Sequence, residues 1–311
     1  MTSIVDIIKP SQDKLFSLLQ NTFAGNSVIC ENNFILVKGV APVLLVAHLD
    51  TVHQYSVETI CKSDDGNILM SPQGIGGDDR CGVFALLNIY ESAKIKPYLL
   101  FTCNEEIGGI GAKSFASAFK YNLIPCNFDS VKLIIELDRK GKNDAVYYDC
   151  DNPDLENYIS GKGFVTSNGS FSDISIIAPA LGIAAVNLSC GYYNPHNPHE
   201  FINLRHLNST IDKVLEIIED STSDSLPKFP YVEKLRSFRY FSYVPHKKNI
   251  SINEEFEDIP DFQPLPSEFH EIYDELLEIY TVEELEDFRH SHGDYALVDL
   301  YFDSFDYGNQ K

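Results

Sequence analysis

The chain has 311 residues, of which 44% are hydrophobic and 23% charged, and its formal net charge is −22. These proportions are ordinary for a folded globular protein and exclude wholesale disorder or a fibrous repeat. The negative charge argues against a nucleic-acid partner, because duplex binding relies on basic side chains at the phosphates. No apolar run approaches the ~20 residues that span a bilayer, and the first residues lack the basic and apolar stretches of a signal peptide. We therefore expect a cytoplasmic protein that does not bind membranes.

The charge is distributed unevenly along the chain. Residues 251–311 contain 18 acidic and two basic side chains, whereas the first 250 residues are only mildly acidic. A run of prolines from Pro227 to Pro266 lies before the acidic piece. These shifts predict a folded body over residues 1–225, a proline-rich connector over 226–266 and an acidic extension over 267–311.

The acidic extension is rich in aromatic residues, unlike a disordered acidic tail. Its apolar residues recur at a helical spacing, and they are Phe269, Ile272, Tyr273, Leu276 and Tyr280. We expect Ser267–His290 to be mostly helical and docked by this stripe, either on the body of the same chain or on a second subunit. The second alternative would make the protein a homo-oligomer.

The body alternates apolar runs of strand length with segments of helical periodicity. In chain order, the sequence predicts a helix over 12–24, an edge strand over 33–38, a buried strand over 42–47, a helix over 82–93, a buried strand over 98–103, a helix over 112–120, strands over 131–137 and 183–189, and a helix over 204–219. This alternation predicts an α/β fold, a three-layer sandwich around a mainly parallel sheet.

The seven cysteines are scattered without a C-x-x-C pair, so we expect reduced thiols rather than disulfides or a structural zinc finger.

Polar residues gather just after the predicted strands, where open α/β sheets build their sites. His48-Leu-Asp50 follows the strand over 42–47. An imidazole at a strand end can bind a metal while a nearby carboxylate holds its other ring nitrogen. A strand-end histidine satisfied by its neighbours is the alternative.

Two further motifs carry adjacent acids. Asp78-Asp79 lies in a glycine-rich turn that leads into a helix; its acids could simply complement the helix dipole, and they exclude a phosphate cradle. Glu105-Glu106 ends the apolar strand over 98–103. Adjacent side chains there point different ways, so one can bind metal while the other carries a proton. A surface acidic pair is the alternative.

Two more strand ends complete the candidate site. Glu136-Leu-Asp138 ends the strand over 131–137, and His196-Asn-Pro-His199-Glu200 follows the strand over 183–189. A solvated strand end and a surface loop are their alternatives. These five motifs offer histidines and carboxylates, which together form a mixed nitrogen and oxygen set. Such a set suits two divalent ions, with zinc expected, if one carboxylate is shared between them.

These motifs resemble those of the co-catalytic di-zinc exopeptidases of the peptidase T, carboxypeptidase G and aminoacylase type. The sequences that carry the resemblance are H-L-D-T-V from His48, G-G-D-D-R-C-G around Asp78, T-C-N-E-E-I-G-G-I-G-A around Glu105, G-S-F-S-D ending at Asp173 and H-N-P-H-E-F from His196. The five motifs occur in the family's order and cover roughly Leu44 to Leu207.

For the first zinc ion, the resemblance implies that His48 is a ligand with Asp50 as the partner that orients it. Asp78 would bridge the two ions. Asp138 would complete the first site, with Glu136 as the alternative. For the second ion, Glu106 and His196 would be the ligands, with His199 as the alternative to the latter. Glu105 would be the general base.

Only 57 residues separate Asp138 from His196, too few for the lid and dimerisation domain that peptidase T inserts there. We therefore expect an architecture closer to the lidless di-zinc aminopeptidases. The resemblance implies a zinc metallopeptidase, an aminopeptidase or di/tripeptidase acting on short peptides. The alternatives are an N-acyl amino acid deacylase and a non-catalytic metal-binding interaction module. The oxyanion donor that a lid would supply could be Tyr192 or Tyr193.

Overall fold

The computed structural model describes residues 3–30, 33–53, 55–222 and 226–234, and seven single positions between 273 and 297. The chain divides into two units, Met1–Ser237 and Phe238–Lys311. Within the described residues, no helix is both long and apolar enough to cross a membrane.

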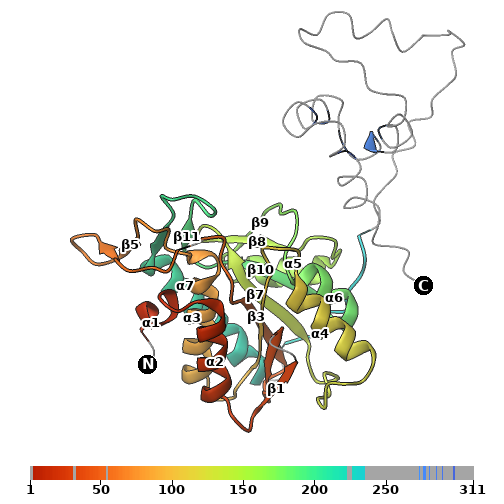
Figure 1. The fold of residues 1–311 in the computed structure, drawn as a ribbon. Helices are drawn as coiled ribbons and strands as arrows, with labels where there is room; N and C mark the ends of the chain where they lie inside the picture. Colours follow the sequence, from red (N-terminus) through yellow and green to blue (C-terminus); the bar gives the residue numbers. More distant parts are fainter. Residues whose placement is uncertain are drawn as a thin grey trace, which may run out of the picture. The chain divides into compact units, whose positions relative to one another are not determined.

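The first unit is built on a central sheet of eight strands, shown in Figure 1. In spatial order these are β1 (Ser27–Cys30), β2 (Phe34–Val37), β6 (Tyr98–Thr102), β3 (Val43–His48), β7 (Leu133–Arg139), β10 (Ala185–Ser189), β8 (Asp144–Val146) and β9 (Val165–Thr166). The four central strands, from β6 to β10, pair in parallel. The sheet is therefore mainly parallel, and the predicted α/β fold class is confirmed.

Helices cover both faces of the sheet, which makes a three-layer structure. On one face lie α1 (Ile4–Ile8), α2 (Gln12–Thr22), α3 (Gly77–Ser92), α5 (Pro153–Gly161) and α7 (Leu204–Thr222), and on the other lie α4 (Ile110–Lys120) and α6 (Ile174–Leu181). A hydrophobic core lies between the sheet and each helical layer, and strand β3 contributes to both. Val43, Leu45 and Ala47 pack in the core on the side of α3 and α7, whereas Leu44 and Val46 pack in the core on the side of α4 and α6. A strand covered on both sides reads as a continuous apolar run.

Short strands that the sequence did not predict form a second, antiparallel sheet. Its order is β11 (Tyr192–Tyr193), β12 (Phe201–Asn203), β5 (Ile68–Met70) and β4 (Cys61–Lys62). This sheet joins the loop that carries His196, between β11 and β12, to the segment that precedes α3.

One predicted element lies elsewhere in the sheet than expected. The strand over 33–38 is not an edge strand, because β1 pairs with β2 on its outer side and every residue of β2 is buried. The four residues of β1 carry no clear periodic signal, so the sequence left the true edge strand unrecognised.

The stretch between Asp138 and His196 contains no separate domain. Its elements, β8, α5, β9, α6, β10 and β11, belong to the two sheets and their helical layers. Beyond α7, residues 226–234 run along the body: Phe229 is buried and Pro230 forms a β-bridge with Ile183. The proposed division into three parts stays a prediction.

In the second unit, Tyr273 and Leu276 are helical and buried, as the apolar spacing predicts. The Leu277 amide donates to the Tyr273 carbonyl at 3.0 Å. Most of the predicted acidic extension lies outside the described residues.

Candidate active site

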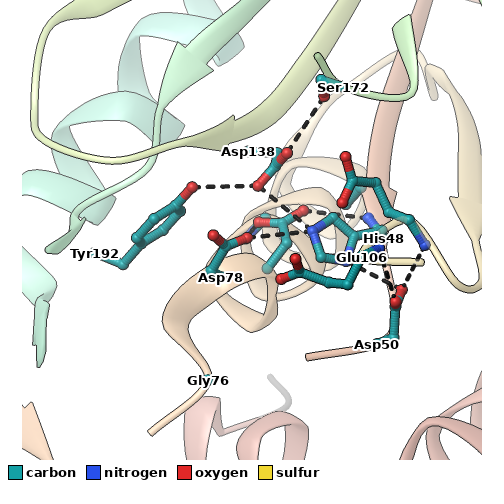
Figure 2. A network of polar contacts seen from close by, with 12 residues as sticks. His48, Asp50, Gly76, Asp78, Glu106, Asp138, Ser172 and Tyr192 are labelled. Atoms are coloured by element: carbon teal, nitrogen blue, oxygen red, sulfur yellow. Dashed lines mark hydrogen bonds and ion pairs between the residues drawn. The ribbon is translucent and has the colours of Figure 1, made fainter. Parts of the chain in front are cut away.

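His48 ends β3 at the carboxyl edge of the central sheet and is almost fully buried. Its Nδ1 lies 3.2 Å from Oδ1 of Asp50. The same Asp50 carboxylate accepts hydrogen bonds from the backbone amides of Glu105 at 3.0 Å and Glu106 at 3.1 Å. Asp50 thus fixes both the imidazole ring and the segment that carries the two glutamates (Figure 2).

Asp78, in the first turn of α3, faces two histidines with its two carboxylate oxygens. Its Oδ1 lies 3.2 Å from Nε2 of His48, and its Oδ2 lies 3.4 Å from Nε2 of His196. Asp138 approaches from β7, with its Oδ1 3.6 Å from Nε2 of His48. Glu106 approaches from the other side, with its Oε2 3.2 Å from Nε2 of His196.

The five expected ligands therefore form two groups of three that share one carboxylate, and a third group joins His48, Glu105 and Glu106. In the first group are His48, Asp78 and Asp138, and in the second are Asp78, Glu106 and His196; within each, one ligand atom per residue lies within 4.8 Å of the others. The structure thus brings together all five residues that the sequence suggested as ligands, whereas Glu136 and His199 belong to neither group.

The donor set fits two divalent ions. Each group offers one imidazole nitrogen and two carboxylate oxygens, the mixture that zinc accepts. Oε1 of Glu106 is buried and has no hydrogen-bond partner among the described residues. So many carboxylates in one buried site are stable only if protons or cations compensate their charge.

The crowding of acids is visible in their pKa values. Burial, together with neighbouring carboxylates, raises the pKa of Glu105 to about 8 and that of Asp138 to about 7. Hydrogen bonding to Asp78, with the negative charge of Glu106, raises the pKa of His196 to about 9. Asp78 differs: burial works against its ionisation, but hydrogen bonds from His196 and His48 hold its pKa below its usual range.

Asp79, joined to Asp78 by a cis peptide bond, holds the backbone next to the candidate ligands in place. Its carboxylate accepts hydrogen bonds from the backbone amides of His48 at 3.2 Å and Gly82 at 2.9 Å. A Cβ atom at Gly82 would lie 2.2 Å from the carbonyl oxygen of Leu137. Glycine at this position is what lets α3 approach β7 so closely.

Asp138 is held in place by its neighbours on β10 and β11. Asn187 accepts a hydrogen bond from the Asp138 amide and donates one to its carbonyl, both at 2.9 Å. Tyr192 donates to its carboxylate at 3.2 Å, and the Ser172 hydroxyl oxygen lies 3.3 Å from its other carboxylate oxygen (Figure 2). Glu136, fully buried behind it, accepts a hydrogen bond from Ser172 instead of facing the site.

The hydroxyl groups of the two tyrosines considered as oxyanion donors both have hydrogen-bond partners. Tyr192 donates to a carboxylate that belongs to the first group. The Tyr193 hydroxyl lies 2.7 Å from Nδ1 of His206, and its ring stacks on Phe201. Tyr193 therefore packs in the small sheet, and Tyr192 orients Asp138.

Sequence reasoning missed the roles of Glu200 and His53. Glu200 is fully buried, and its carboxylate accepts hydrogen bonds from the backbone amides of Gly76 and Asp78, both at 2.9 Å. Its Oε2 also lies 2.8 Å from Nε2 of His53. The position of Glu200 between the histidine-rich loop and β12 was the signal that sequence offered for its role. Its partners, however, include backbone amides, which a sequence motif does not reveal.

The fold is similar to solved structures of peptidases. A tripeptidase from Staphylococcus aureus is 15% identical with a TM-score of 0.54, over 71% of this chain and 97% of that one. Aminopeptidase PepT from Bacillus cereus is 14% identical with a TM-score of 0.53, over 70% and 97%. A TET aminopeptidase from a marine-sediment Thaumarchaeota archaeon is 12% identical with a TM-score of 0.54, over 71% and 99%.

No protein-family model matches the sequence, and the comparison with curated proteins found no match. At the identities found among solved structures, the likeness establishes a peptidase-like fold. The chemistry has to be argued from the residues of the site.

Proposed function

We propose that this protein is a metallohydrolase that cleaves a terminal peptide bond of a short peptide with two divalent ions, zinc being the expected metal. The observation that carries the proposal is the placement of Asp78, whose two oxygens each face one group of potential ligands. A carboxylate shared in this way is typical of a dinuclear site. The peptidase folds of the similar structures support the same reaction class.

Two bound ions would lower the pKa of an attacking water toward neutrality and polarise the scissile carbonyl. Glu105 is the proposed general base. One of its carboxylate oxygens lies within 4.8 Å of a His48 ring nitrogen and a Glu106 oxygen, so it borders the site. Glu105 would take the proton from the water and pass it to the leaving amine.

The remaining residues hold this arrangement. Asp50 would keep His48 in the tautomer that leaves Nε2 free to bind a cation, because Nδ1 faces the Asp50 carboxylate. The hydrogen bonds that Asp50 accepts from the amides of Glu105 and Glu106 would set the base relative to the ligands. Such preorganisation is what a hydrolytic site requires.

The test is an assay of the metal-loaded protein against amino-acid anilides, short peptides and N-acetyl amino acids, with Glu105→Gln as the matched inactive control. Hydrolysis of peptides by the unmodified protein, and not by Glu105→Gln, supports the proposal. Hydrolysis of N-acetyl amino acids alone would identify a deacylase. Equal rates for the two proteins would exclude Glu105 as the base.

A further inference from the structure

A cavity of about 280 Å³ lies beside the proposed active site, between the N-terminal segment and two loops. Its walls come from residues 8–12, 50, 51, 53, 55–57, 74–76 and 80. None of the five proposed ligand side chains lines it, although Asp50 and Gly76 form part of its wall. The cavity is thus adjacent to the metal site and distinct from it.

The buried guanidinium of Arg80 lines this cavity and is only partly satisfied. Arg80 is 4% exposed, and its Nη1 donates to the carbonyl oxygen of Ile7 at 2.8 Å. Its Nε is buried and has no hydrogen-bond partner among the described residues. Burial lowers the pKa of Arg80 to about 10, so the group stays charged at neutral pH. Asp50 and Asp79 also stabilise the charge of Arg80, so what the group lacks is a hydrogen-bond acceptor for Nε, which a ligand would supply.

The first turn of α2 adds further donors to the same cavity. Ser11 is the N-cap residue of this eleven-residue helix, and its side chain makes no capping hydrogen bond. Ser11 and Gln12 both line the cavity. The free amides at a helix N-terminus carry a partial positive charge. The exposed side chain of Lys9 lies next to them in the wall.

The charges of the wall select an anion in a protein whose net charge is −22. Arg80 and Lys9 contribute two positive charges, and Asp50 is the one acid in the wall. Both Asp50 oxygens are already engaged, by His48 and by the amides of Glu105 and Glu106. The lining side chains therefore carry one net positive charge. Asp79 also lies near Arg80, but burial raises the pKa of Asp79 well above its usual range, which favours its neutral form. The lining thus suits a monoanion.

We propose that this cavity binds a small molecule through its carboxylate, which would bond Arg80 and the first turn of α2. A guanidinium whose Nη1 is occupied can still present its Nε edge to a planar carboxylate. The apolar residues Ile8, Val57 and Ile75 in the wall would hold the body of the ligand. A cavity of about 150 Å³ holds benzene, so this one has room for a ring or a short side chain with its carboxylate.

The carboxylate can have two sources. It can be the free carboxyl group of a peptide substrate or product, a case that rests on the proposed function. It can also be a separate small acid. In either case the ligand would lie beside His53, which contacts Glu200 and through it the amide of Asp78.

Calorimetric titration with benzoate, and with benzamide as the neutral control, tests the proposal. We expect benzoate to bind both the metal-loaded and the EDTA-treated protein, with benzamide at least about tenfold weaker. Lys9→Gln should weaken benzoate binding several-fold, whereas Lys120→Gln on α4 should not. Equal binding of benzoate and benzamide, binding that EDTA abolishes, or equal affinity of the two lysine variants would each overturn the proposal.

Arg80→Gln should remove benzoate binding if circular dichroism shows that the variant folds. If Arg80→Gln does not fold, the comparison of benzoate with benzamide and the Lys9→Gln variant still test the proposal. Lys9 is exposed, so its replacement should not disturb the fold.

Steady-state kinetics with trialanine and its C-terminal amide separate the two sources. If the carboxylate belongs to the substrate, benzoate competes with trialanine, and Lys9→Gln raises KM for the acid but not for the amide. If it belongs to a separate acid, benzoate does not compete and the two KM values stay equal. Absence of turnover would contradict the proposed function and leave the titration result standing.

Discussion

The carboxylate of Glu200 lies 2.9 Å from the backbone nitrogen of Asp78 and accepts its hydrogen bond across 122 residues of sequence. The second carboxylate oxygen accepts from Gly76 and contacts His53. Glu200 thus holds the turn that presents the shared carboxylate, without itself facing the ligand groups. We regard it as a positioning residue.

The first prediction is that Glu200→Ala weakens both the fold and the metal site. Two buried amides would lose a charged acceptor, so the free energy of unfolding should fall by about 2–4 kcal/mol. Metal affinity, measured by competition with a chelator well below the melting temperature, should fall as well. Glu200→Gln should be milder, since an amide oxygen can still accept, and Glu58→Ala on the surface is the control. Unchanged metal affinity in Glu200→Ala would leave Glu200 with a purely structural role.

The second prediction is that Asp78→Asn uncouples the two metal positions. A neutral amide cannot bridge two cations as a carboxylate does, so metal occupancy and turnover should fall together. Elemental analysis and peptide hydrolysis of the same preparation provide the two readouts. A variant that keeps two ions and full activity would remove Asp78 from the bridging role.

The third prediction separates the adjacent glutamates. Glu105→Gln should keep both ions and lose about 10²–10⁴ in kcat, because an amide of the same volume cannot accept a proton. Glu106→Gln should lose one ion. Metal content and kcat of both variants give the comparison, and the reverse pattern would show that the two roles are exchanged.

The fourth prediction concerns pH and follows from the raised pKa values of Glu105, Asp138 and His196. Without metal, the folded state keeps protons that the unfolded state releases at lower pH. The free energy of unfolding of the metal-free protein should therefore decrease as pH rises from about 5 to 8. Bound cations replace these protons, so zinc should raise the melting temperature more at pH 8 than at pH 5.

Melting curves with EDTA and with zinc at both pH values check this prediction. Asp138→Asn removes one of the titrating groups and should flatten the decrease in the metal-free protein. An equal effect of zinc at the two pH values would show that these groups do not exchange protons for metal.

Sequence alone predicted the parallel core and the residues that meet at its edge. Strand β3 is apolar up to His48, its last residue, because both of its faces are covered. That signal does not depend on distant contacts. His48 and Asp138 lie at adjacent strand ends because parallel strands share one carboxyl edge. The local sequence pattern and the topology of a parallel sheet therefore both predicted that these residues lie close together.

The elements that sequence did not predict depend on long-range pairing. β1 and the strands of the small sheet have two to four residues, too few to show a period. Glu200 acts on backbone amides that come close only after β12 pairs with β5. Tyr193 was grouped with Tyr192 by sequence, but adjacent residues of a strand point to opposite faces.

Elemental analysis of the purified protein and of its single-ligand variants is the most direct test of a dinuclear site. We expect two divalent ions per chain in the unmodified protein, one in Glu106→Gln and one in Asp138→Asn, since each variant disturbs one of the two groups that share Asp78. One ion or none in the unmodified protein after incubation with zinc, or two ions in both variants, would contradict the account.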